Sequence, residues 1–198
     1  MTEIQEELCS HSEYITAIIG VCGTLLGTIV GWLLNSLSRK GKLNIYISNW
    51  IDKFSRHDNY GGMEPCTSIE PVEYYSYSLC LDIYNSSSES RIMRNIAVVF
   101  SDGNGDIYTE TPADDSTRHS IASVPFYDEV TPLTIQPKSV YTLNLHGGSQ
   151  KKDGVPLFIW SVKKVFLNYT DEKNKQKKVL LKEEDYSKYF ENHMQEGL

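Results

Sequence analysis

The stretch from Asp102 to Ala113 contains residues of the types that bind calcium. Asp102, Asn104 and Asp106 stand at the first three ligand positions of an EF-hand loop. The pattern then fails, because Ile107 stands where the loop needs Gly and Ala113 stands where it needs Glu. The residues between Asp102 and Asp106 are Gly, Asn and Gly, which suit tight turns. We therefore expect a hairpin turn here and no metal site.

The histidines give no sign of a catalytic or metal centre. They are His11, His57, His119, His146 and His193. None of them has the spacing of a zinc site, and no C-x-x-C pair is present, so we expect ordinary surface histidines. Arg56, His57 and Asp58 are adjacent polar residues, which we interpret as mostly solvated.

Motifs for nucleophilic or nucleotide chemistry are also missing from the sequence. It has no G-x-S-x-G elbow, no P-loop and no G-x-G-x-x-G fingerprint. Cys66 follows a proline and is a candidate exposed thiol, but no positioned base accompanies it. We therefore predict no catalytic residue, no metal ligand and no cofactor, and we expect that the protein is not an enzyme.

The cysteines indicate the redox compartment. Cys22 lies in an apolar run and Cys9 lies just before it, so only Cys66 and Cys80 could pair within a folded domain. One candidate pair is not a disulfide framework, which favours a reducing compartment slightly.

The apolar run is the clearest organisational signal. No charged residue occurs from Ile15 to Leu34, and the uncharged stretch extends from Tyr14 to Ser38. A helix of about 20 residues crosses the ~30 Å hydrocarbon core of a bilayer. Tyr14 and Trp32 lie near the two ends, where aromatic rings favour the interface. The run therefore predicts a transmembrane helix.

Two other interpretations of the run are weaker. A cleaved signal peptide needs a basic start and a small-residue cleavage site, but this chain starts with several glutamates and no A-x-A follows the run. A buried helix of a soluble protein rarely continues this far without a polar stripe.

The flanking charges predict an orientation. Arg39, Lys40 and Lys42 directly follow the run, and no basic residue precedes it. The positive-inside rule then places the long C-terminal part in the cytoplasm and the acidic N-terminus outside. In the cytoplasm, the glycosylation patterns at Asn85 and Asn168 would carry no sugar.

Glycines recur at every fourth position of the run. Gly23, Gly27 and Gly31 share one helix face, and Thr24 and Thr28 lie beside them. Small residues let membrane helices approach closely, and threonines add hydrogen bonds, so we predict a helix-packing face. It would pair two copies, build a larger ring or dock another membrane protein. An ion pathway has little support, because no charged stripe crosses the run.

The pattern of the remaining sequence predicts short strands. Leu43–Ser48 alternates apolar and polar residues, and we interpret residues 49–65 as irregular because of Gly61-Gly62 and Pro65. The clearest strand is residues 72–85. Its predicted core face comprises Tyr75, Tyr77, Leu79, Leu81 and Ile83, and its other face Ser76, Ser78, Cys80 and Asp82.

Further strands follow this one at intervals of about ten residues. We expect a hairpin around the turn at residues 102–105, two short runs broken by Pro137, and a last hairpin in which residues 155–170 and 177–182 flank a polar turn. The tail places Tyr186, Tyr189 and Phe190 at helical spacing, which indicates a short terminal helix.

This pattern predicts an all-β, immunoglobulin-like antiparallel β-sandwich preceded by one N-terminal transmembrane helix. A small β-barrel is the alternative. The Cys…Trp…Cys signature of antibody domains is missing. The expected organisation is an acidic segment at 1–13, the transmembrane helix at 14–38, a basic linker at 39–42, the β-sandwich at 43–185 and a tail at 186–198.

Two groups of residues are candidate binding surfaces. Trp50, Phe54 and Tyr60 could face a partner or lipid headgroups, although we favour a role in capping one end of the sandwich. The other group is lysines of the last hairpin, which could contact anionic lipid or, as we prefer, discourage edge pairing. These are Lys163, Lys164, Lys173, Lys175, Lys177 and Lys178.

The composition and organisation together favour binding over catalysis. A formal net charge of -7 argues against nucleic acid as a partner. We predict a single-pass membrane-anchored binding or adaptor protein with a cytoplasmic immunoglobulin-like domain. The span would contact the bilayer and would bind further copies of the chain or another membrane protein. The β domain would bind an unknown protein or ligand. The alternative is a membrane effector, whose β domain senses a ligand or partner and whose clustered spans disturb the bilayer.

Overall fold

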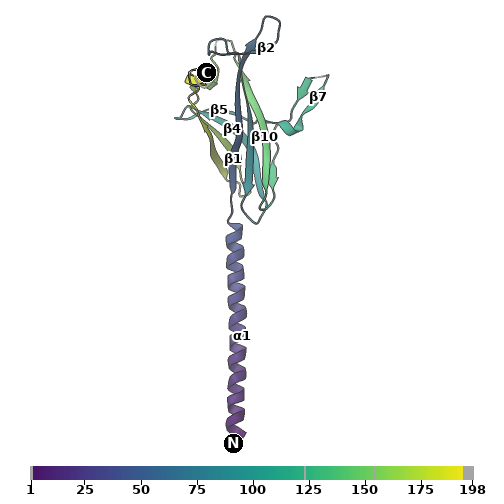
Figure 1. Ribbon diagram of the computed structural model, residues 1–198, viewed down its shortest axis with the longest axis vertical. Coiled ribbons are helices and arrows are strands. Elements are labelled where there is room, and N and C mark those ends of the chain that lie inside the picture. Colours follow the sequence, from purple (N-terminus) through teal and green to yellow (C-terminus); the bar gives the residue numbers. More distant parts are fainter. Residues whose placement is uncertain (1, 123, 154, 194–198) are drawn as a thin grey trace. The chain divides into compact units, whose positions relative to one another are not determined.

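The computed structural model describes residues 2–122, 124–153 and 155–193, with only the backbone described for residues 2–13 (Figure 1). The chain forms two compact units, Met1–Lys42 and Leu43–Leu198.

The first unit is one continuous helix, α1 (Thr2–Arg39). It starts earlier than the predicted residues 14–38, because the preceding Glu, Gln and Leu residues are good helix formers and acidic residues suit a helix N-terminus. The segment Tyr14–Arg39 has 26 residues, and its most apolar window has a mean hydropathy of 2.1, so the segment is long and apolar enough to cross a membrane. None of the helix's most apolar window is buried. Lys40 forms a turn, its amide donating to the Leu37 carbonyl at 3.1 Å.

The second unit contains two five-stranded sheets, counting β9, and a small ribbon, all antiparallel. The first sheet has the order β2-β1-β3-β10-β6. Its strands are β1 (Leu43–His57), β2 (Met63–Pro65), β3 (Tyr74–Asn85), β6 (Ala113–Asp114) and β10 (Val140–Gln150). The second has the order β12-β11-β4-β5, and β9 pairs with the start of β4. Its strands are β4 (Arg91–Ser101), β5 (Asp106–Glu110), β9 (Leu133–Ile135), β11 (Lys164–Thr170) and β12 (Gln176–Glu183). The ribbon pairs β7 (His119–Ile121) with β8 (Val124–Phe126).

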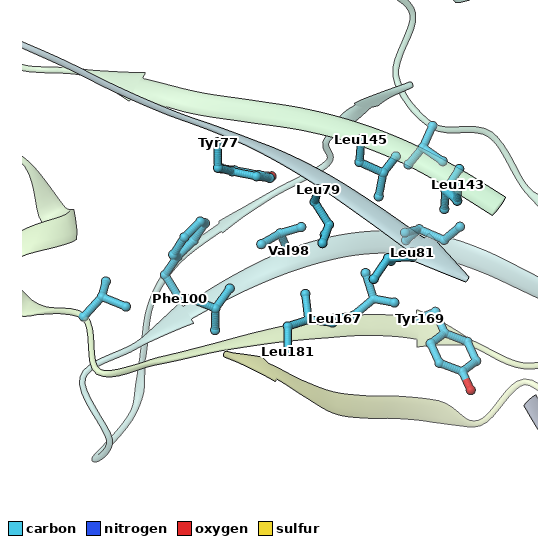
Figure 2. Close-up of a cluster of buried hydrophobic side chains, with 14 of the residues drawn as sticks. Tyr77, Leu79, Leu81, Val98, Phe100, Leu143, Leu145, Leu167, Tyr169 and Leu181 are labelled. Carbon is cyan, nitrogen blue, oxygen red and sulfur yellow. The ribbon is translucent and has the colours of Figure 1, made fainter. Parts of the chain in front are cut away.

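The strand order is that of an immunoglobulin-like domain. The first sheet contains strands A, B, E and D as β1, β3, β10 and β6, and the second contains G, F, C and C′ as β12, β11, β4 and β5. The two sheets remain separate and face each other across the core, so the structure is a sandwich and not the alternative barrel (Figure 2). The predicted fold class is confirmed.

The core lies between the sheets, and β3 contributes as the sequence predicted. Every second residue from Tyr75 to Ile83 is at most 2% exposed, whereas the alternate residues remain partly or fully accessible. Across from them lie Val98 and Phe100 of β4 and Leu167 of β11 (Figure 2). Burying one such side chain contributes about 1.5–3 kcal/mol, so this alternation is the main determinant of the fold.

The prediction that residues 49–65 are irregular is correct for the turn at residues 58–62 and wrong for the residues on either side. β1 continues to His57, and β2 pairs back onto it from Met63. The reason is a β-bulge between Ile47 and Asn49, which shifts the register against β3 by one residue. Beyond the bulge the even-numbered residues turn inward, so Trp50 joins the core face and the alternation seen from Leu43 is broken.

The aromatic residues after the bulge close one end of the core. Phe54 is buried, and its ring centroid lies 5.2 Å from Trp160 and 4.8 Å from Tyr189. Trp50 stacks on Tyr77 at 5.1 Å. Tyr60, in contrast, is 98% exposed. The capping role is therefore correct for Trp50 and Phe54 and wrong for Tyr60.

The described residues of this unit also form four short helices: η1 (Asp115–Thr117), η2 (Phe158–Ser161), η3 (Tyr186–Lys188) and α2 (Tyr189–His193). Residues 158–161, expected within a strand, form a 3₁₀ turn instead. The predicted terminal helix is present within the described residues, which end at His193. Tyr186 is fully buried, so the folded domain extends beyond the predicted boundary at 185.

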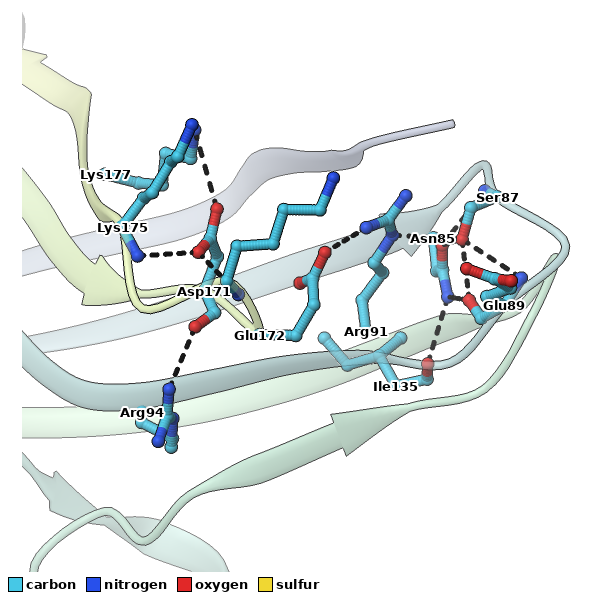
Figure 3. A network of polar contacts seen from close by, with 11 residues as sticks. Asn85, Ser87, Glu89, Arg91, Arg94, Ile135, Asp171, Glu172, Lys175 and Lys177 are labelled. Atoms are coloured by element: carbon cyan, nitrogen blue, oxygen red, sulfur yellow. Dashed lines mark hydrogen bonds and ion pairs between the residues drawn. The ribbon is translucent and has the colours of Figure 1, made fainter. Parts of the chain in front are cut away.

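Hydrogen bonds tie the β3–β4 loop to its neighbours at the end of the sandwich where β1 begins (Figure 3). Asn85 is fully buried, and its Nδ2 donates to the carbonyls of Glu89 at 2.8 Å and Ile135 at 3.0 Å. Arg91 pairs with Glu172 of the β11–β12 turn. The amide nitrogen that a glycan would need is thus used inside the fold, so Asn85 is a structural residue whichever side of a membrane it occupies.

Candidate functional site

The predicted helix-packing residues lie on the surface of α1. A Cβ added at Gly23, Gly27 or Gly31 would meet nothing within 4 Å in the described chain. The Thr24 hydroxyl donates to the carbonyls of its own helix at 2.8–3.0 Å, and the Thr28 hydroxyl does so at 2.8 Å. The glycine face is therefore open, and the threonine hydroxyls are engaged within the helix. Helix packing through this face stays a prediction.

The basic residues that predicted the orientation lie at the end of α1 and just after it. Arg39 is the last helical residue, Lys40 lies in the turn, and Lys42 immediately precedes β1. The positive-inside argument depends on this order along the chain, and the orientation stays a prediction.

The acidic turn after β4 is a hairpin turn, as predicted. Asp102 Oδ1 accepts hydrogen bonds from the amides of Asn104 at 2.7 Å and Gly105 at 2.8 Å, and Gly103 adopts a φ of 95°. The hydrogen bond from the Gly105 amide, and after it the one from the Asn104 amide, holds the pKa of Asp102 below its usual value. Within the described residues no group of three or more His, Cys, Asp or Glu side chains could hold a metal ion.

The other residues singled out in the sequence have local partners. Arg56 pairs with Glu64, while the His57 amide donates to Glu73 at 3.0 Å and lowers the pKa of that carboxyl. Cys66 and Cys80 are both free thiols, half-buried in the fold. Burial raises the pKa of Cys66, which disfavours the nucleophilic thiolate.

The lysines of the last hairpin have mixed environments. Lys177 pairs with Asp171 at 3.6 Å, and Lys178 pairs with Asp106. The side chains of Lys173 and Lys175 are exposed. Because β12 is an edge strand, lysines along it suit protection against edge pairing better than a continuous lipid-binding face.

A groove that the sequence did not reveal lies on the outer side of the first sheet. It has a volume of about 540 Å³ and is lined by Lys53, Ser76, Tyr77, Ser78, Asp115, Arg118, Tyr127 and His146. Lys53 lies opposite Ser76, and Ser76 lies opposite Gly148. Cross-strand partners share a face of the sheet, so two small residues form a row beside the lysine. The groove is lined on β3 by Ser76 and Ser78, whose side chains are small.

One wall of the groove comes from the segment between β6 and β8. β6 pairs with β10 at His146, so the chain leaves β6 directly beside the histidine. Asp114 then caps η1, accepting from the Ser116 amide at 2.9 Å, and Asp115 is placed against His146. The Thr117 hydroxyl accepts from the Asp128 amide at 2.8 Å, which ties the two halves of the segment together.

Among the described residues, the groove contains one acid with a hydrogen-bond partner and two cations without an ion pair. The Asp115 carboxylate accepts a hydrogen bond from His146 Nδ1, because a carboxylate has no hydrogen to donate. The Tyr127 ring packs edge-on against His146, with centroids 4.4 Å apart. Lys53 and Arg118 are exposed and form no ion pair with another described residue.

This arrangement suits recognition better than catalysis. The bond between Asp115 and His146 Nδ1 is the orienting half of a catalytic triad, and Ser78 is the cross-strand partner of His146. However, no hydrogen bond joins a hydroxyl or thiol to the His146 ring among the described residues. A nucleophile needs that contact for activation, whereas binding needs only a concave surface with suitable donors.

A second polar cluster lies on the inner side of the same sheet. Asp52 has a side chain only 1% exposed. It accepts hydrogen bonds from Trp50 Nε1 at 2.8 Å, Tyr75 Oη at 2.8 Å, Tyr186 Oη at 3.0 Å and Lys182 Nζ at 2.7 Å. Burial, followed by the nearby Asp52 charge, raises the pKa of Tyr186, and burial raises that of Tyr75. With both oxygens engaged, Asp52 joins the two sheets and the tail rather than a ligand.

Sequence patterns alone could not identify the groove residues. Lys53, Ser78, Asp115 and His146 come from four separate segments, and each fits an ordinary polar position of its own segment. The only available signal was the unusual run His146-Gly147-Gly148 at the end of an alternating strand, because paired glycines weaken a strand unless space is needed there.

Comparisons with known proteins concern the sandwich. A family model described as the YopI Ig-like domain matches residues 41–182. The SPbeta prophage-derived protein YopI of Bacillus subtilis (strain 168) is 24% identical over 173 residues, which cover 86% of this chain and 97% of that protein. Among solved structures, the ApaA protein from Bordetella pertussis is 11% identical with a TM-score of 0.35, covering 73% of this chain and 91% of that one.

Proposed function

Since the chain belongs to the YopI Ig-like domain family, we propose that it is a membrane-anchored binding protein whose sandwich recognises a ligand. The observation that supports the binding role is the groove on the outer side of the first sheet, whose two cations form no ion pair with another described residue. Immunoglobulin-like domains offer such surfaces on a rigid scaffold, and function resides in the surface rather than in the fold. We propose no catalytic activity.

The surface of α1 supports the membrane anchor. Its large apolar side chains are exposed along the whole segment from Ile15 at 57% to Leu37 at 53%. A continuous apolar surface of this length is unfavourable in water and favourable in a bilayer. The helix is therefore expected to insert as a single span.

The proposed orientation places the sandwich in the cytoplasm. Arg39, Lys40 and Lys42 follow the span, and basic residues are retained on the cytoplasmic side. The free thiols of Cys66 and Cys80 suit a reducing compartment.

The topology of the full chain tests this proposal. A reporter that is active on only one side of the membrane is fused after Leu198, and the membrane fraction is washed with alkaline carbonate. We expect carbonate-resistant protein with a cytoplasmic C-terminus. Release by carbonate would refute the anchor, and an outside C-terminus would refute the orientation and make the sandwich a surface-displayed binding domain.

The open glycine face supports a second candidate function, that of a membrane effector acting through clustered spans. Gly27→Ile would place a branched side chain in the middle of the predicted contact, whereas Leu25→Ile changes the opposite face with little change of volume. Cross-linking of the full chain in membranes should show fewer oligomers for Gly27→Ile only. Equal cross-linking of both variants and the unmodified chain would exclude helix packing through the glycine face, and the effector function with it.

A further inference from the structure

We propose that the groove on the outer side of the first sheet binds the oxyanion, phosphate or carboxylate, of a small ligand. The inference rests on the proposed binding function and names the chemical class that the site would recognise. The charges, the donors and the shape of the groove support this ligand class.

The charges of the groove favour an anion. Lys53 on β1 and Arg118 after η1 line it from different segments, and neither has a described ion-pair partner. The acid that lines it, Asp115, is engaged by His146. Two free cations in a concavity concentrate positive potential there, although the chain as a whole is acidic. Arg118 also has the planar set of donors that fits two oxygens of one anion.

Neutral donors complete the site. Ser76 and Ser78 present hydroxyl groups on the outer face of β3. His146 donates its Nδ1 hydrogen to Asp115, so in the neutral ring Nε2 is an acceptor and the serine hydroxyls are the neutral donors of the site. An oxyanion has several lone pairs on each oxygen, so it can accept bonds from such a set at the same time.

The shape indicates a small ligand. A volume of about 540 Å³ falls within the range of about 300–1,000 Å³ typical of small-molecule sites. The lining residues Ser76 and Ser78 have small side chains, and the Tyr127 ring offers an apolar surface beside the charges. A ligand with an anionic group next to an apolar or planar part would match both.

The test uses the full chain in detergent micelles. Inorganic phosphate and, separately, succinate are titrated at constant ionic strength, and backbone amide shifts are followed by NMR. We expect saturable shifts at Ser76, Ser78 and His146, with a dissociation constant on the order of 1 mM for an isolated anion in an open site. Saturation by phosphate alone indicates a phosphorylated ligand, and saturation by succinate alone indicates a carboxylate ligand.

Charge-removing variants locate the binding. Lys53→Gln and Arg118→Gln should each weaken binding by at least about fivefold, because each removes one of two cations. Lys173→Gln, an exposed lysine of the β11–β12 turn, should leave the affinity unchanged. Thermal unfolding of each variant checks that the fold is intact.

Two outcomes would overturn the inference: shifts that do not saturate with either anion, or equal affinity in all three variants. Neither outcome affects the topology experiment. If the protein is membrane-anchored but binds neither anion, the proposed function stands and the anionic ligand is refuted. Release by carbonate would refute the anchor, whatever the groove binds.

Discussion

The two faces of β3 have different roles, one in the core and the other in the groove. On the inner side, Tyr75, Tyr77 and Leu81 are at most 1% exposed and pack against the second sheet. On the outer side, Ser76 and Ser78 are small, remain accessible and form part of the groove. A strand alternates its side chains between faces, so stability and recognition can be specified independently at neighbouring positions.

Two aspartates show the same contrast in their hydrogen bonds. Asp52, on the inner side, accepts from four different side chains and is almost completely buried. Asp115, on the outer side, has a side chain 40% exposed, and its only described side-chain partner is His146. A carboxylate whose oxygens are fully engaged is part of the fold, while one beside unpaired cations remains available to tune a ligand site.

The largest effect is expected from Asp52→Ala, which breaks the inner cluster. Removing the carboxylate leaves the Tyr75 and Tyr186 hydroxyls without this acceptor, and it leaves Lys182 Nζ with the longer ion pair to Glu184 at 3.6 Å. We expect a loss of about 3 kcal/mol in the free energy of unfolding, near the lower end for a broken buried pair because Lys182 keeps some access to water. The measurement is thermal unfolding of the full chain in micelles, followed by tryptophan fluorescence.

Asp115→Ala is the matched control on the outer side. Its free energy of unfolding should stay within about 0.5 kcal/mol of the unmodified chain, as for other surface substitutions. If the two aspartate variants lost similar stability, the division of the sheet into a structural and a recognition side would be wrong.

Gly148→Ala should have the next largest effect. An added Cβ would lie 2.3 Å from the Tyr75 carbonyl oxygen, a backbone atom that cannot rotate away. We expect a loss of about 1–3 kcal/mol in stability from this overpacking, together with weaker binding in the groove. Gly105→Ala, whose Cβ would meet nothing within 4 Å in the described chain, should be nearly neutral by the same unfolding measurement. Equal losses would mean that the close approach of β3 and β10 is not what requires glycine.

The sequence predicted the fold wherever one alternation continued without interruption. β3 is such a strand, since its core face from Tyr75 to Ile83 is wholly apolar or aromatic and its outer face is polar. β1 was predicted only to Ser48, because the bulge there reverses which residues point inward. A bulge leaves no composition signal, so the second half of β1 looked irregular.

The groove could not be predicted for a different reason. Its cations, Lys53 and Arg118, are far apart in sequence. They line the same groove only because β3 and β10 pair between the segments that carry them. The contribution of the tail was also hidden. The helical spacing of Tyr186 and Tyr189 predicted a helix, but only the structure shows that Tyr186 reaches Asp52. Sites built from cross-strand neighbours need the register, which single-sequence patterns do not contain.

Glu110 offers a smaller test of the inner side, because it is a carboxylate without the full set of donors that Asp52 has. Its Oε1 is buried with no hydrogen-bond partner of good geometry among the described residues. The Tyr108 hydroxyl donates to Oε2 at 3.4 Å. Burial raises the pKa of Glu110 above its value in the unfolded chain, although the nearby Tyr77 hydroxyl and Gly148 amide, like the Tyr108 hydroxyl, act to lower it. The neutral form therefore contributes stability below the unfolded pKa of about 4.3, and that contribution is lost as the pH rises through the folded pKa.

Glu110→Gln should accordingly stabilise the protein at pH 7, where the ionised side chain is buried at a cost, and have little effect near pH 4. Each kcal/mol gained corresponds to about 2–4 °C in Tm for a domain of this size. The measurement is the difference in Tm between variant and unmodified chain across this pH range, with the exposed Glu70→Gln as the control that should show no pH-dependent difference. A lower Tm at pH 7 would mean that the ionised Glu110 is well satisfied in the fold. The inner side would then hold two structural carboxylates rather than one.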